Sequence, residues 1–143
     1  MNKVKKIEIA KELLEAALFH YYETGSYFAS IQCAGAAEEV LGKYVETYGG
    51  ESAFESLNKG ARRISRALNG QESSKKAISY IMNYAKNSTK HMSGSGDTTV
   101  YLDPKEAARD LIDRAVENYY YLMQYIELEE TENVKRFKQE LVA

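Results

Sequence analysis

Apolar residues recur every three to four positions along most of the chain, which is the spacing of helices that each bury one face. The first such segment runs from about Val4 to Thr24 and stops at Gly25. The second runs from about Tyr27 to Tyr48 and stops at Gly49-Gly50. Because the connection between them is short, the two segments are expected to form an antiparallel helical hairpin.

Two further helices are expected from their start signals. Ser52 and Glu55 have the spacing of a capping box and open a third helix, which ends at Asn69-Gly70. A fourth helix begins near Ser73 or Ser74 and fades toward His91. The third helix is expected to face the core with Leu57, Ile64 and Leu68. The fourth is expected to bury Ile78, Ile81, Met82 and Ala85.

The clearest start signal is Asp103-Pro104 followed by Glu106, where Asp caps, Pro takes the first helical position and Glu closes the box. A long fifth helix should follow. Before it come a glycine-containing loop at 92–97 and a β-prone stretch at 98–102. The pattern therefore predicts an all-α protein, a four- to five-helix up-and-down bundle over residues 1–128. Residues 129–143 are expected to form an acidic linker and a short C-terminal helix or tail.

Composition narrows the class of protein. A chain of 143 residues fits one domain with its own hydrophobic core. Cys33 is the only cysteine, which excludes an internal disulfide and a Cys-rich zinc site and favours a reducing, cytoplasmic setting. No stretch approaches the roughly 20 apolar residues of a membrane span, so no membrane association is expected. The twelve tyrosines are expected in the core or at an interface.

Charge is unevenly distributed along the sequence. Residues 58–91 carry eight basic side chains against one acid, Glu72, whereas residues 1–57 and 92–143 are both acidic. A mildly acidic protein of net charge −2 thus has a basic middle third that can attract anions.

The end of the fourth helix holds the residues best suited to chemistry. Lys86, Asn87, Lys90 and His91 make one polar corner there, with imidazole for proton transfer and ammonium groups for binding phosphate. Lys86 and His91 are about 140° apart around an ideal helix, so joint action requires an early helix end or a second copy of the chain. The alternative is a cationic helix terminus that simply favours the macrodipole.

Glu38 falls on the apolar stripe of the second helix and should be partly buried, which requires a cation beside it. The cations considered are Arg62, Arg63, Lys86 and His20. A structural ion pair and a supporting catalytic role both remain open for Glu38. No motif for a phosphate-binding loop, a metal site or a serine nucleophile is present, so no metal and no cofactor is expected.

Two segments give the chain a family resemblance. The hairpin segment 27–42 and the later 86–91 segment resemble those of the HEPN superfamily of small helical domains, and the likeness covers most of residues 5–126. The family motif is an arginine, usually followed by a polar residue, and then a histidine after four to six intervening positions. Asn87 and His91 match this pattern, while Lys86 stands where arginine is expected.

The resemblance implies a helical bundle, often a homodimer with two motifs in a shared cleft, and a metal-independent endoribonuclease activity of toxin type. On this basis His91 would be the acid and base, Lys86 the phosphate-binding group and Asn87 an orienting group. Lysine keeps the charge but loses the bidentate fork of arginine. The residues expected to contact RNA are Arg62, Arg63, Arg66 and Lys90.

The alternative is a non-catalytic, dimeric HEPN-like interaction module. Such a module would dimerise through tyrosine-rich faces, with Tyr119 and Tyr120 as the contact residues, and bind a nucleotide or a companion protein of the nucleotidyltransferase type. This alternative accounts directly for the lysine in the motif. A purely structural bundle is the third option.

Overall fold

The computed structural model describes residues 1–143 and contains six α-helices and no strand. The helices are α1 (Lys6–Phe19), α2 (Tyr27–Thr47), α3 (Ala53–Asn69), α4 (Lys75–Ser88), α5 (Pro104–Leu122) and α6 (Glu132–Val142). The all-α class expected from the sequence is confirmed. Residues 98–102, although β-prone, form no strand.

The helix ends follow the local sequence signals closely. Ser52 Oγ accepts a hydrogen bond from the Glu55 amide at 3.2 Å, and Asp103 Oδ1 accepts one from the Glu106 amide at 3.0 Å. Gly25 adopts φ 68° after a single π-helical turn, His20–Thr24, which continues α1. These helix ends are therefore set by residues that lie close together in the sequence.

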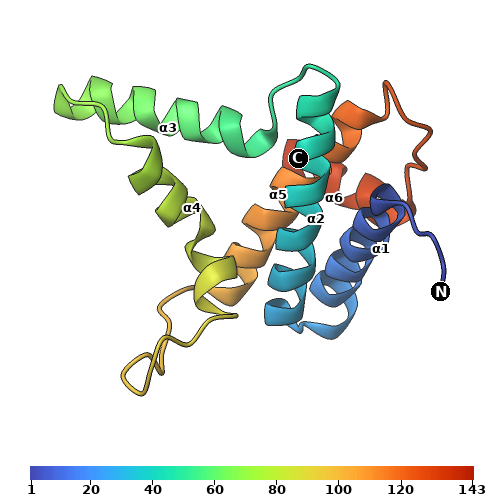
Figure 1. The fold of residues 1–143 in the computed structure, drawn as a ribbon, viewed down its shortest axis with the longest axis horizontal. Helices are drawn as coiled ribbons and strands as arrows, with labels where there is room; N and C mark the ends of the chain where they lie inside the picture. Colours follow the sequence, from blue (N-terminus) through green and yellow to red (C-terminus); the bar gives the residue numbers. More distant parts are fainter.

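The core lies where α1, α2 and α5 pack side by side, as Figure 1 shows. Helix α2 contacts α5 and α1 along most of its length. α6 closes one side of this group by burying Val134 and Phe137 against it. The largest fully buried side chains include Leu14, Leu18, Ile31, Leu41, Leu111, Ile112 and Leu122.

Helices α3 and α4 form an arm that projects from the bundle. In Figure 1 α3 starts beside α2 and runs outward from the bundle, and α4 returns toward it. Asn118 anchors the base of this arm, because its Oδ1 accepts a hydrogen bond from the Ala53 amide at 2.9 Å and its Nδ2 donates to the Glu38 carbonyl at 3.4 Å. Residues 53–88 are thus held to the bundle at the start of α3, and contacts of α4 with α2 and α5 hold them again at the end of α4.

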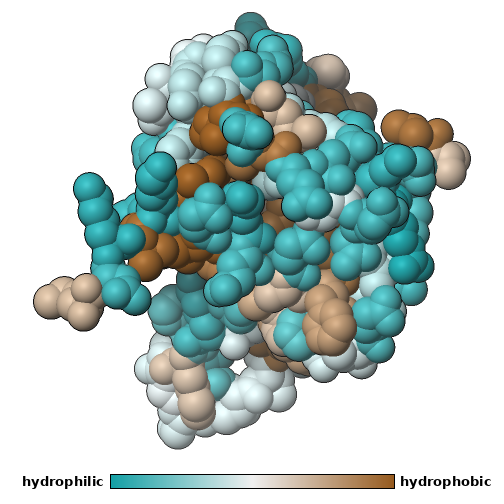
Figure 2. Space-filling view, turned by 90° about the vertical axis from the view of Figure 1, so that its right-hand side faces the viewer, coloured by the Kyte–Doolittle hydropathy of each residue, from teal (hydrophilic) through white to brown (hydrophobic).

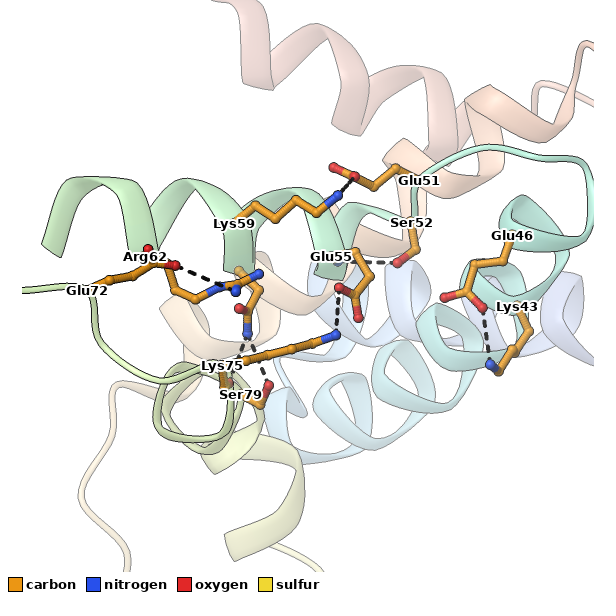
Figure 3. Close-up of polar contacts among 11 residues, drawn as sticks. Lys43, Glu46, Glu51, Ser52, Glu55, Lys59, Arg62, Glu72, Lys75 and Ser79 are labelled. Carbon is orange, nitrogen blue, oxygen red and sulfur yellow. Dashed lines mark hydrogen bonds and ion pairs between the residues drawn. The ribbon is translucent and has the colours of Figure 1, made fainter. Parts of the chain in front are cut away.

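Polar contacts fix the two helices of the arm to each other (Figure 3). Buried Asn58 donates from Nδ2 to Ser79 Oγ at 3.0 Å, and Lys75 pairs with Glu55 at 3.1 Å. A further ion pair joins Arg62 to Glu72 at 3.7 Å near the turn. Because polar groups make much of this contact, pairing α3 with α4 leaves much of the apolar surface of the arm uncovered.

The prediction that α3 presents its apolar stripe to the core is wrong. Leu57, Ile64 and Leu68 are 49%, 61% and 77% exposed, and the only buried residues of α3 are Ala53 and Asn58. In α4, Ile81 is also exposed, while the other apolar side chains expected inside are only half-buried. The periodicity correctly identified an apolar face, but no element of the same chain covers that face.

Candidate functional site

A buried ion-pair cluster lies where α4 crosses α2. Lys86 Nζ is 3.6 Å from Glu38 Oε1 and 2.5 Å from Glu39 Oε1, and Arg114 Nε is 3.5 Å from Glu38 Oε2. Lys86, Glu38 and Arg114 are each nearly inaccessible to solvent. The expectation that a cation meets Glu38 is confirmed, and Lys86 is the one of the four candidates that does so.

The backbone around the cluster is shaped to hold Lys86. A Cβ atom placed on Gly35 of α2 would lie 3.0 Å from Lys86 Cδ, so the glycine leaves room for the aliphatic stem of the lysine. Gln32 Nε2 donates to the Lys86 carbonyl at 3.0 Å and fixes the last turn of α4 on α2. Lys86 is therefore part of the packing between α2 and α4.

Arg114 was not anticipated from the sequence. It lies on the same stripe of α5 as the core residues Leu111 and Ala115, and that position in an apolar stripe was the available signal. Burial lowers the pKa of Arg114, while the nearby Glu38 carboxylate acts in the opposite direction. Its Nη2 also donates to the Met82 carbonyl of α4 at 3.2 Å, so Arg114 joins α5 to both α2 and α4.

Asn87 and His91 are brought together, but not with Lys86. Both line an open pocket of about 260 Å³ that also includes Tyr84 and Asp97. Lys86 instead lines a separate pocket of about 350 Å³ with the glutamates of α2. Within one copy of the chain, the imidazole and the Lys86 ammonium therefore do not face a common ligand.

His91 lies beyond the end of α4 and is exposed. Its amide donates to the Asn87 carbonyl at 3.2 Å. The loop at 92–97 borders its pocket and is closed by Asp97 Oδ2, which accepts from the Ser93 amide at 2.9 Å. Imidazole beside an acid on an open surface can exchange protons, yet no cation lines this pocket to bind a phosphate.

The cations expected to contact RNA occupy different places. Arg62 is partly buried and paired with Glu72, whereas Arg63 and Arg66 on α3 are exposed and have no ion pair. Lys90 is also exposed but lies at the far end of α4, which is about 21 Å long. Hence the structure provides exposed positive charge along the arm rather than one cationic site around His91.

Tyr119 does not lie on an exposed face of the protein. Its side chain is buried in the core, and its hydroxyl donates to the Glu129 carbonyl at 2.5 Å. Tyr120 is half-buried, with the Lys138 ammonium 5.3 Å from its ring centroid. Tyr119 is therefore a core side chain and not part of an exposed tyrosine-rich face.

Comparisons with protein families, curated proteins and solved structures give no match to this chain. No group of three or more His, Cys, Asp or Glu side chains is arranged to hold a metal ion. None of the six helices combines the length and apolar character needed to cross a membrane.

Proposed function

We propose that the protein is a HEPN-like, non-catalytic interaction module that self-associates through the apolar face of its α3–α4 arm. The observation that carries the proposal is the exposure of Leu57, Ile64 and Leu68 on one side of an otherwise well-formed helix. Contiguous apolar surface of this kind on a soluble domain marks a contact site. Aligned leucine and isoleucine side chains on a helix are suited to packing against another protein surface.

An apolar groove continues this surface toward the bundle. It has a volume of about 500 Å³ and runs between α3, α4 and α5. Leu57 and Ala61 form its α3 side, and Ile81, Met82 and Ala85 form its α4 side. The arm therefore presents this groove next to the exposed stripe of Leu57, Ile64 and Leu68. Together they increase the apolar area that a partner can bury.

The state of Lys86 favours binding over catalysis. In a ribonuclease of the HEPN type, this position would contact a substrate phosphate. Here its ammonium is paired with Glu38 and Glu39 and is buried, so releasing it for a phosphate would leave carboxylate charge unpaired. This cost supports a module in which the motif has a structural role.

Sedimentation velocity across a dilution series tests the proposal. The wild-type protein should show a reversible shift from monomer to larger species as concentration rises. Replacement of both exposed side chains, Ile64→Asp with Leu68→Asp, should abolish the shift without loss of helical circular dichroism. A wild-type protein that remains monomeric at every concentration would overturn self-association.

Binding of RNA is a second candidate, favoured by the exposed and unpaired side chains of Arg63 and Arg66. Such binding should weaken steeply with added salt because phosphate contacts release counterions. Filter binding of a mixed-sequence RNA to wild type and to Arg63→Ala/Arg66→Ala tests it. Affinity that is equal for the two proteins would exclude a role for these arginines.

A further inference from the structure

The groove between α3, α4 and α5 has one wall that differs in chemistry from the others. Its α3 and α4 sides are apolar, whereas α5 contributes two carboxylates, Asp110 and Asp113, beside Ala107 and Leu111. Its volume of about 500 Å³ falls within the range of about 300–1,000 Å³ that is typical of pockets for small organic molecules. On the side of the molecule away from the arm, hydrophobic residues instead lie between hydrophilic ones (Figure 2). The groove therefore combines apolar walls with an acidic edge.

Asp110 and Asp113 have no cation close enough to balance their charge. None of the ion pairs of the chain includes either carboxylate. Arg114 also lines the groove, but its guanidinium pairs with Glu38 and donates to the Met82 carbonyl. Because residues three positions apart are neighbours on a helix, the two aspartates form one patch of negative charge.

The ionisation of the two aspartates agrees with this geometry. Partial burial raises the pKa of both carboxyl groups above the ordinary aspartate value. The Glu106 carboxylate acts in the same direction on Asp110, whereas Arg109 and Arg114 act in the opposite direction on both aspartates. Since the pKa of each carboxyl is raised despite these arginines, a cation bound in the groove would stabilise the charged form of both.

We propose that this groove binds a small organic cation that has a hydrophobic body. Its ammonium or guanidinium group lies at Asp110 and Asp113, where it balances the unpaired carboxylates. Its body packs against Leu57, Ile81 and Leu111 and is thereby removed from water. A bare metal ion is a poorer match, because no group of three or more His, Cys, Asp or Glu side chains is arranged to hold one.

The inference goes beyond self-association of the arm. Ile64 and Leu68, whose replacement tests self-association, do not line the groove. Leu57 belongs to both surfaces, so cation binding is measured in wild type and also in Ile64→Asp/Leu68→Asp, where no second copy competes for the groove. The two proteins should bind the cation at least equally well when both are monomeric. Loss of binding in this variant would overturn the placement of the site within one copy.

Three probes with the same hydrocarbon chain and different head groups test the proposal: octylamine, octanol and octanoate. Titrations followed by methyl NMR give an affinity for each probe. Octylamine should shift the methyl signals of Ile81 and Leu111 saturably and should bind about tenfold more tightly than octanol, because its charge meets the two carboxylates. Octanoate should bind most weakly, since the aspartates repel it. Equal affinity of the wild-type protein for octylamine and octanol, or no saturable shift with any probe, would overturn the proposal.

Replacing the two carboxylates tests their role in the groove. Asp110→Asn/Asp113→Asn should bind octylamine and octanol equally, because the amides keep the shape of the aspartates and remove their charge. The matched control is Glu117→Gln, which removes an exposed carboxylate of α5 outside the groove and should keep the preference for the amine. A preference that persists in Asp110→Asn/Asp113→Asn would overturn the assigned site. Where circular dichroism shows that this double variant is unfolded, the exposed change Asp110→Asn replaces it and should reduce the preference.

Discussion

Lys86 and Glu38 are paired in the interior of the protein, with 3.6 Å between Nζ and Oε1 and each side chain at most 5% exposed. Lys86, which the sequence predicts at a polar corner, is thus a packing residue between α4 and α2. Its charge is balanced by carboxylates of its own chain. Because Glu38 and Glu39 already engage its ammonium, Lys86 has a structural role at the end of α4.

Removal of the Lys86 charge should destabilise the fold. Lys86→Met leaves Arg114 as the only cation close to Glu38. Loss of one partner of a buried ion pair lowers the free energy of unfolding by up to about 5 kcal/mol. Urea unfolding measures the change. Adding Glu38→Gln should recover part of the lost stability, so the two changes should be strongly non-additive. Equal stability of wild type and Lys86→Met would contradict the buried pair.

Gly35→Ala should also destabilise the protein, although alanine is the better helix former by about 0.5–1 kcal/mol. The added Cβ would lie 3.0 Å from Lys86 Cδ, and the ion pairs of Lys86 prevent the stem from moving aside. The added Cβ would also lie 3.2 Å from Lys86 Cβ, so the test background is Lys86→Gly, in which both contacts are gone and the same substitution should become stabilising. A stabilising effect in both backgrounds, measured by urea unfolding, would show that the stem moves freely.

Asn118→Ala should loosen the arm selectively. The substitution removes the side chain that accepts from the Ala53 amide and donates to the Glu38 carbonyl, at a cost of about 1–3 kcal/mol. Hydrogen–deuterium exchange of α3 should accelerate more than that of α1. As a matched comparison, Asn58→Ala should accelerate exchange in α3 and α4 without affecting the base of the arm. Uniform acceleration across all helices would argue against a local anchor.

Stability should fall at alkaline pH. Burial raises the pKa of Tyr119 from 10.0 to about 12, so the folded state holds the phenolic proton more tightly than the unfolded state. The corresponding stabilisation is complete below pH 10 and is lost as the pH rises from 10 toward 12. Denaturant unfolding over this range measures the fall, and Tyr119→Phe should reduce it. An identical pH dependence in the variant would exclude Tyr119 as a source.

The capping residues of α3 and α5 were predicted correctly from the sequence. The caps at Ser52 and Asp103 depend on residues only three positions apart, so they were predicted without knowledge of the tertiary structure. The residues that pair with Glu38 were harder to predict than the helix caps. Glu38 was expected to meet a cation because its position on an apolar stripe implied burial, but Arg114 lies 76 positions away and only the fold brings it near.

The exposed apolar stripe of α3 shows what the spacing of apolar residues cannot predict. Leu57, Ile64 and Leu68 have the same spacing as core residues of α1, and spacing alone predicts an apolar face without identifying what packs on it. The basic side chains on the rest of α3 were read as a phosphate-binding surface. At about 100° per residue, Arg66 lies on the opposite side of α3 from Ile64 and Leu68, so the exposed stripe and these charges form different surfaces.

The central claim, that the arm is the contact surface between copies, is tested most directly by methyl NMR of the wild-type protein during dilution. The methyl signals of Ile64 and Leu68 should shift with protein concentration, while the signals of the core residue Leu41 stay constant. Signals of Ile64 and Leu68 that remain unchanged while sedimentation reports assembly would contradict the claim.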